Sequence, residues 1–152
     1  MTDLHFRRAV AADLPAIVRM LADDPIGQGR EAMGEALDAA YTAAFSAIDA
    51  DPNQLLAVAE DDRGVIGTLQ LSFIPGLSRK GAWRGQIEAV RVARDCRSEG
   101  LGRRMIEWAI AECRSRGCAL VQLTTDKARP DAHRFYEQLG FVASHIGYKL
   151  SL

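Results

Sequence analysis

Apolar residues recur along this chain with two different spacings, one typical of helices and one typical of strands. The clearest helical stripe follows Asp13, which is expected to cap its start. A second helix is expected over about residues 31–50, an alanine-rich stretch. The polar segment 23–31, DDPIGQGRE, separates the two helices because proline and glycine interrupt them. The first stripe consists of Leu14, Ile17, Val18 and Leu21, and the second of Met33, Leu37, Tyr41, Ala44 and Ile48.

Shorter apolar runs bounded by turn residues predict the strands. Residues 55–60 and 65–73, joined by the turn DDRG, have the pattern of a β-hairpin. Two more helices are expected, one from about residue 100 to residue 116 and one at residues 130–139, each followed by a glycine. The remaining strands are expected at about residues 4–8, 83–92, 119–125 and 141–150.

The predicted order of elements is β-α-α-β-β-β-α-β-α-β. No internal repeat, linker or low-complexity segment divides this order. The chain has 152 residues, 48% of them apolar and 26% charged, which suits one α/β domain with its own core. We therefore expect a single domain over residues 1–152.

Charge and cysteine content exclude several classes of function. The net charge is −1, which favours neither a nucleic-acid-binding surface nor a polybasic membrane anchor. No secretory leader and no membrane-spanning segment are expected. Three cysteines without CxxC or Cys/His ligand spacing indicate reduced thiols in a cytoplasmic protein without a metal site.

The segment RSEGLGRR, residues 97–104, is the strongest candidate for a binding site. Its glycines, Gly100 and Gly102, follow a predicted strand and open a predicted helix, and helix starts present unpaired N–H groups to anions. Arg97, Arg103 and Arg104 add positive charge, whereas Glu99 opposes it. If the backbone binds the anion, Glu99 is expected to point to water. The alternative is a plain strand-to-helix turn without a ligand.

Two motifs in this order resemble those of the GNAT N-acetyltransferase superfamily, in particular its bacterial small-molecule enzymes. The first is R-x-x-G-x-G after the strand IEAVRV, and the second is HRFYEQLGF near residue 140. The order of elements is also similar over nearly the whole chain. The resemblance implies a mixed, mostly antiparallel twisted sheet flanked by helices, with acetyl-CoA as the donor substrate.

The resemblance also implies which residues bind the donor. The strand residues Val90, Arg91 and Val92 are expected to give backbone hydrogen bonds to the acetyl group and the pantetheine arm, beside a bulge and a splayed neighbouring strand. Arg129 stands where many members have an asparagine that contacts pantetheine, and Arg129 or His133 would instead meet the CoA phosphates; a solvated surface position is the alternative for His133. The pyrophosphate is expected on the loop amides of Arg97, Ser98, Glu99, Gly100, Leu101, Gly102 and Arg103.

Two side chains are expected to carry the acid–base chemistry. Glu88 lies among apolar neighbours on the strand, and partial burial would raise its pKa toward a useful range for a base. The alternative is a charge on the open face of the strand, paired with Arg84 or Arg91. Tyr136, in the second motif, matches the family tyrosine that protonates the leaving thiolate; the alternative is a core aromatic side chain.

Together these features predict an acetyl-CoA-dependent N-acetyltransferase that acts on the primary amine of a small molecule by direct attack in a ternary complex. A protein or peptide acetyltransferase and a non-catalytic acyl-CoA-binding module are the alternatives. Gln86 weakens the first alternative, because protein-lysine enzymes of the family usually have a carboxylate there. Asp23 and Asp24 would attract a cationic amine, or simply belong to a polar loop. The resemblance leaves a monomer and a homodimer as alternatives, because many relatives dimerise, often through their C-terminal strands, and residues 141–152 would form the exposed edge.

Overall fold

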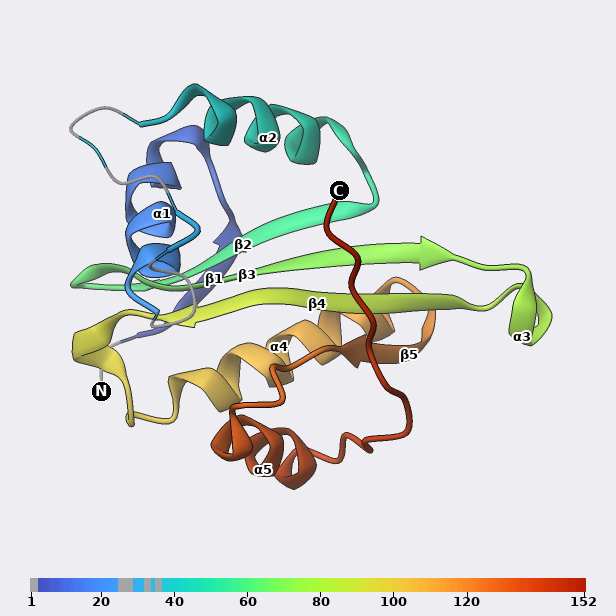
Figure 1. Cartoon of the computed structure of the whole chain (residues 1–152). Helices are drawn as coiled ribbons and strands as arrows, with labels where there is room; N and C mark the ends of the chain where they lie inside the picture. Colours follow the sequence, from blue (N-terminus) through green and yellow to red (C-terminus); the bar gives the residue numbers. More distant parts are fainter. Residues whose placement is uncertain (1–2, 25–28, 32–33, 35–36) are drawn as a thin grey trace.

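A five-stranded sheet forms the centre of the computed structural model, which describes residues 3–24, 29–31, 34 and 37–152. The strands lie in chain order across the sheet (Figure 1). The first three junctions are antiparallel and the last, between β4 and β5, is parallel. The mostly antiparallel sheet agrees with the sequence prediction. The strands are β1 (His5–Arg8), β2 (Gln54–Asp61), β3 (Gly64–Pro75), β4 (Trp83–Val92) and β5 (Cys118–Leu123).

Helices cover both faces of this sheet. Figure 1 shows α1 (Leu14–Ala22) and α2 (Ala39–Ala50) on one side, and α4 (Leu101–Ser115) and α5 (Pro130–Gln138) on the other. Short 3₁₀ turns precede α1 (η1, Ala11–Asp13) and α4 (η2, Arg94–Cys96), and a four-residue helical turn, α3 (Ser78–Gly81), joins β3 to β4. Within the described residues, no helix is long and apolar enough to cross a membrane.

Two helix starts differ from the prediction. The second helix was expected from about residue 31, but α2 begins at Ala39, where the Asp38 side chain accepts a hydrogen bond of 2.8 Å from the Ala40 N–H. Met33, expected on this helix, lies outside the described residues. Asp13 does not cap α1 through its side chain. Its carboxylate instead accepts hydrogen bonds from the Val10 N–H and from Arg7.

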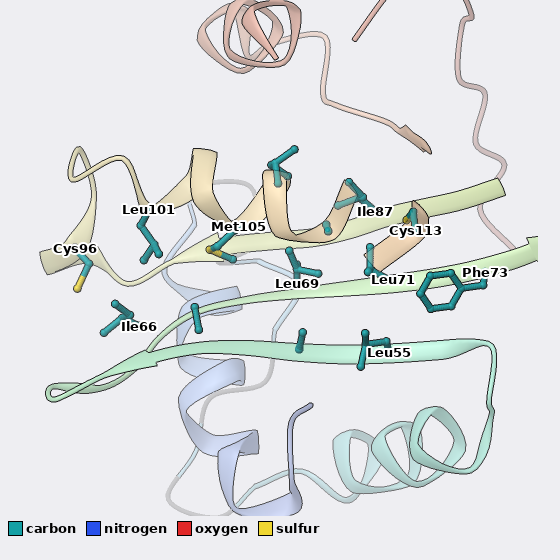
Figure 2. Packing of buried hydrophobic residues seen from close by; sticks show 14 residues of the cluster. Leu55, Ile66, Leu69, Leu71, Phe73, Ile87, Cys96, Leu101, Met105 and Cys113 are labelled. Atoms are coloured by element: carbon teal, nitrogen blue, oxygen red, sulfur yellow. The ribbon is translucent and has the colours of Figure 1, made fainter. Parts of the chain in front are cut away.

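The main core lies between the sheet and α4 (Figure 2). Leu71, Met105 and Ile106 are essentially inaccessible to solvent, and their burial provides the main driving force that fixes α4 on the sheet. Figure 2 also places Leu101 and Cys96 at one end of this cluster, beside the start of α4. The segment between them, which contains Gly100, is therefore anchored by buried side chains at both ends.

Strand β4 contains a bulge directly before its last residues. Thr68 pairs with Arg91 and Gln70 pairs with Glu88, so β4 has one more residue than β3 across this interval. Ala89 lies within this interval and has a φ of 52°, in the left-handed region, as expected of a residue in a bulge. The bulge that the family resemblance implied is thus present.

The sheet opens beyond the bulge. The β4–β5 ladder ends at the pair Ile87 and Leu123. Residues 88–92 of β4 consequently have no ladder partner on the β5 side among the described residues. The backbone groups of this segment therefore form no ladder hydrogen bonds with β5, although the Val90 and Val92 carbonyls accept hydrogen bonds of 2.9 and 3.2 Å from Arg91 Nη1 and Arg97 Nε.

The last predicted strand, residues 141–150, is wrong. The structure assigns no strand there, and Val142, Ile146, Tyr148 and Leu150 are exposed. The alternation of apolar and polar residues is typical of a strand, but a strand also needs a partner. Figure 1 shows the segment running across the view past β5 and β4 without joining the sheet.

Candidate active site

The loop between β4 and α4 contains two residues with left-handed backbone conformation. After η2, Ser98 and Gly100 adopt left-handed conformations with φ of 69° and 77°. Helix α4 begins at Leu101 with no side-chain cap. The N–H groups of its first turn are therefore not satisfied by a capping side chain, which favours an anionic ligand at this point.

A pocket of about 390 Å³ opens against this loop. Its size lies in the range of small-molecule and cofactor sites. Seven of the residues predicted to bind the donor line it, and three others, Cys96, Phe135 and Gln138, were not predicted. The full lining is Val92, Cys96, Arg97, Ser98, Gly100, Leu101, Gly102, Arg103, Phe135 and Gln138.

Phe135 and Gln138 enter the lining from α5. Phe135 lies close to the loop, because a Cβ added to Gly102 would come within 3.6 Å of the Phe135 ring. Phe135 fits a core position on an amphipathic helix, so its sequence pattern gave no sign that it faces the pocket. Cys96 also lines the pocket, but burial raises the pKa of its thiol, which makes it a weak nucleophile at neutral pH.

Glu99 is not among the lining residues. Its carboxylate accepts hydrogen bonds of 3.3 and 3.2 Å from Arg63, in the turn between β2 and β3. The same guanidinium also pairs with Asp61. The negative charge of the loop is thus turned toward the hairpin.

Asp23, at the end of α1, binds two arginines of the loop region. Arg94 donates hydrogen bonds to its carboxylate, and Arg97 Nη2 lies 3.5 Å from Oδ2. Residues 25–28 of the same polar segment lie outside the described residues. The Asp23 carboxylate is therefore already compensated by cations, which does not favour the hypothesis that it attracts a cationic amine.

Asp24 lies between two further arginines. Arg91 Nε is 3.2 Å from Asp24 Oδ2, and Arg129 Nη1 is 3.8 Å from the same oxygen. Burial lowers the pKa of Arg91, although a guanidinium stays charged at neutral pH. The side chains of Arg91 and Arg129 thus point to the end of α1 and do not line the loop pocket.

Tyr136 is close to both of these arginines. Burial raises its pKa above the ordinary value for a tyrosine, while the positive charges of Arg129 and Arg91 partly oppose that rise. Its ring packs edge-on against Phe135 and Phe141, with centroid distances of 5.1 and 5.8 Å. The hydroxyl has no hydrogen-bond partner within the described part of the chain, so a substrate atom would be free to accept its proton.

Glu88 is exposed on β4, next to the bulge. The partial burial assumed from its apolar neighbours is thus absent, because Glu88 lies on the face of β4 opposite the buried Gly85 and Ile87. Among the described residues it pairs with neither Arg84 nor Arg91. Nearby, Gln86 accepts a hydrogen bond of 2.7 Å from Gln122 across the β4–β5 junction.

His133 is neither free in solvent nor part of the loop pocket. Its Nε2 lies 2.9 Å from the carbonyl oxygen of Asp126, and because a carbonyl only accepts, Nε2 carries the proton. The contact ties α5 to the segment before it. The described residues contain no group of three or more histidine, cysteine or acidic side chains placed to hold a metal ion.

The sheet, the bulge and the loop pocket can be compared with known proteins. The Acetyltransferase (GNAT) family model matches residues 15–141. The chain belongs to the GNAT acetyltransferase family. A relative, the aminoalkylphosphonate N-acetyltransferase of Salmonella typhimurium (strain LT2), is 32% identical over 113 residues, which cover 74% of this chain and 73% of that protein.

Solved structures share the GNAT fold over nearly the whole chain. A protein from Bacillus halodurans C-125, described as a transcriptional regulator, superposes with a TM-score of 0.96 at 46% identity and covers 99% of this chain and 100% of its own. A putative acetyltransferase from Agrobacterium tumefaciens (strain C58) gives a TM-score of 0.85 at 27% identity, with 97% and 99% covered. GNAT enzymes use acetyl-CoA and an amine acceptor.

Proposed function

We propose that this protein is an acetyl-CoA-dependent N-acetyltransferase that acylates the primary amine of a small molecule within a ternary complex. The observation that carries the proposal is the pocket of about 390 Å³, built by the signature loop of the family. The α4 start without a side-chain cap and the arginines Arg97 and Arg103 fit the negative charge of a pyrophosphate. Glu99 does not oppose this fit because Arg63 holds it away.

The open edge of β4 is proposed to hold the rest of the donor. Val90, Arg91 and Val92 have no β5 partner, so this edge is proposed to meet the pantetheine arm and the acetyl carbonyl. The Val90 and Val92 carbonyls accept hydrogen bonds from Arg91 Nη1 and Arg97 Nε, and the donor would have to displace these side chains or use the remaining backbone groups. Such a strand contact would fix the thioester between the loop pocket and Tyr136. Arg129 and His133 are also proposed to contact acetyl-CoA, but they rank below the strand residues. The Arg129 side chain already binds Asp24, and the His133 side chain already binds the Asp126 carbonyl.

Acetyl-CoA supplies the thioester, whose C–S bond breaks as the new C–N bond forms. Tyr136 is proposed to donate its hydroxyl proton to the leaving sulfur, and its raised pKa keeps it protonated at neutral pH. Glu88 is proposed to accept the proton of the attacking amine. Because Glu88 is exposed, a water molecule between Glu88 and the amine would relay this proton equally well.

The proposed acceptor carries an acidic group as well as its amine. The acceptor in the name of the Salmonella relative is an aminoalkylphosphonate, which has both groups. Near Tyr136, Arg91 and Arg129 face the carboxylate of Asp24, and the next charges around Arg91, those of Arg30 and Glu31, offset each other. The excess of positive charge supports an acceptor whose anionic end lies toward these arginines.

The proposed location of the protein is the cytoplasm. Its three cysteines are free thiols, which is consistent with that reducing compartment.

The test is an acetyl-transfer assay with acetyl-CoA and a panel of aminoalkylphosphonates, amino acids, polyamines, amino sugars and a lysine-containing peptide. Acetylated product is measured by mass spectrometry, because it identifies the acetylated amine directly. We expect turnover with small amines and the highest rate with an acidic one. Turnover on the peptide alone would replace the proposal by a protein acetyltransferase. Binding of acetyl-CoA without any turnover would replace it by a non-catalytic module.

A further inference from the structure

The face of the sheet opposite α4 carries a connected set of uncharged polar side chains. On β3, Gln70 and Ser72 alternate with Leu71 and Phe73, which are buried in the main core, so the two polar side chains lie on the other face. On β2, Gln54 Oε1 accepts a hydrogen bond of 2.9 Å from Gln70 Nε2 and another of 2.9 Å from Ser72 Oγ. These side chains therefore hold one another in place across two strands.

The network ends directly beside the proposed base. Gln70 is the cross-strand partner of Glu88 in the β3–β4 ladder, and the side chains of such partners share one face with their Cβ atoms roughly 5 Å apart. Gln70 is half-buried and Glu88 is exposed, so both side chains can be reached from that face. A neutral amide and a carboxylate thus stand side by side on neighbouring strands, next to the bulge of β4.

The bond to Gln54 determines which end of the Gln70 amide is left for a ligand. Gln70 Nε2 donates to Gln54 Oε1, an oxygen that can only accept, so the NH₂ group of Gln70 is held on that side. Among the described residues, no group donates to Gln70 Oε1. That oxygen and the Glu88 carboxylate are both hydrogen-bond acceptors, which suits a ligand group that donates several N–H bonds, as an amine does.

We propose that Gln70 binds the amine of the acceptor, and that Gln54 is the positioning residue that orients Gln70. Gln70 Oε1 accepts one N–H of the amine while Glu88 accepts the proton that the amine loses, so this role rests on the proposed function. A neutral oxygen suits the place, because the amine must become uncharged before it attacks. A second carboxylate would favour the charged ammonium and raise the pKa of the amine, whereas an amide oxygen accepts from both forms.

The first experiment compares two probes that differ only in the amine, 2-aminoethylphosphonate and ethylphosphonate, by isothermal titration calorimetry in the presence of CoA. We expect the parent protein to prefer the probe with the amine, and Gln70→Met, a variant of similar size, to lose about tenfold of this preference. The matched control Gln122→Met breaks the amide pair with Gln86 on the same face and is expected to keep the preference. No preference in the parent protein, an unchanged preference in Gln70→Met, or equal losses in both variants would overturn the proposal.

The second experiment tests the positioning role of Gln54 with the same two probes. Gln54→Met leaves Gln70 in place but removes the oxygen that orients it, so we expect about a threefold loss of the preference for the amine. Added to Gln70→Met, the substitution is expected to cause no further loss, because Gln54 acts through Gln70. A further loss in that background, or weaker binding of ethylphosphonate, would show that Gln54 only supports the fold.

Acetyl transfer separates the role of Gln70 from the proposed function. Where the parent enzyme turns over, Gln70→Met is expected to raise the KM for the amine about tenfold and to leave the KM for acetyl-CoA nearly unchanged. Turnover with an unchanged KM for the amine in Gln70→Met would refute the role of Gln70 and keep the proposed function. Preferred binding of the amine probe without turnover on any amine would refute the proposed function and keep the amine contact.

Discussion

Arg63, in the β2–β3 turn, binds the carboxylate of Glu99, with 3.2 Å between Arg63 Nη2 and Glu99 Oε2. The pair connects a hairpin turn to a loop that lies 36 positions later in the chain. It turns the negative charge of the loop away from the pocket that Gly100 and Gly102 line. A carboxylate within this loop is therefore compatible with the proposed binding of an anion.

This geometry predicts that Glu99→Gln changes the affinity for acetyl-CoA less than about twofold, because the Glu99 side chain does not line the pocket. Gly100→Val is expected to weaken binding at least tenfold. Its φ of 77° is a conformation that a β-branched residue adopts only at a cost of roughly 1–2 kcal/mol, so the loop must change shape. Isothermal titration calorimetry with acetyl-CoA measures both.

Gly102→Val is expected to weaken binding by a different route. The new side chain would lie against Phe135 and occupy the pocket itself. Equal unfolding temperatures of the variants and the parent protein would confirm that the losses concern binding. A strong effect of Glu99→Gln together with a weak effect of both glycine variants would show that the loop binds its ligand through side chains.

Tyr136→Phe is expected to lower kcat about 100-fold while the Kd for acetyl-CoA changes little, because general acid catalysis contributes on the order of 10²–10⁴. Since burial raises the pKa of Tyr136, its proton is present through neutral pH and is lost only above the ordinary tyrosine range. The parent enzyme is therefore expected to show no loss of kcat from this group below about pH 10. A pH profile of kcat measures this, and an unchanged kcat in the variant would remove the acid role.

The local part of the site could be predicted from sequence, because it depends on residues close together in the chain. Gly100 and Gly102 predict a strained turn at the start of a helix. The motif around Tyr136 predicts the helix that carries this tyrosine. The contacts of Asp23 and Asp24 could not be predicted, since their arginine partners lie about 70 or more positions away. The position of Phe135 at the pocket could not be predicted either. A residue that faces a pocket and one that faces the core give the same spacing of apolar residues along the sequence.

In the fold too, the features that depend on nearby residues could be predicted, and those that depend on distant residues could not. Helix α4 and the β2–β3 hairpin form where their sequence patterns predict them. The apolar residues that set each pattern are the ones buried in the core. Glu88 has apolar neighbours in sequence, but it lies on the face of β4 opposite the buried Ile87 and is exposed. Residues 141–150 have a strand pattern without a strand, since pairing depends on another segment. Local preferences are readable in a sequence, whereas the choice of partner is made by the whole fold.

Gly85→Ala is expected to destabilise the fold by about 1–3 kcal/mol, as added volume in a packed core does. A Cβ at Gly85 would lie 2.3 Å from Cys113 Sγ and 3.3 Å from its Cβ, so β4 and α4 would have to separate. Urea unfolding measures the loss. The double variant Gly85→Ala with Cys113→Ala removes the closest atom and should recover part of the stability lost by Gly85→Ala. Absence of any recovery would mean that the strain arises elsewhere.

The Arg7 guanidinium joins two carboxylates, and this pairing makes stability depend on pH. It donates hydrogen bonds of 2.7 and 3.0 Å to the buried Asp13, and of 3.0 and 2.8 Å to Glu60. These bonds hold the pKa of Asp13 below its ordinary value of 3.8. A carboxyl whose pKa is lowered by folding stabilises fully above its unfolded pKa, and that contribution is lost as pH falls through the folded value.

Asp13→Asn is therefore expected to cost about 1–2 kcal/mol at pH 7, a range that allows for the partial exposure of Arg7. The difference from the parent should shrink below about pH 4, where the parent begins to lose the same interaction. Denaturant unfolding at pH 7, 4 and 3 measures it, with the exposed Asp62→Asn as the matched control. A difference that stays constant down to pH 3 would mean that Asp13 contributes through shape and hydrogen bonding alone, independent of its charge.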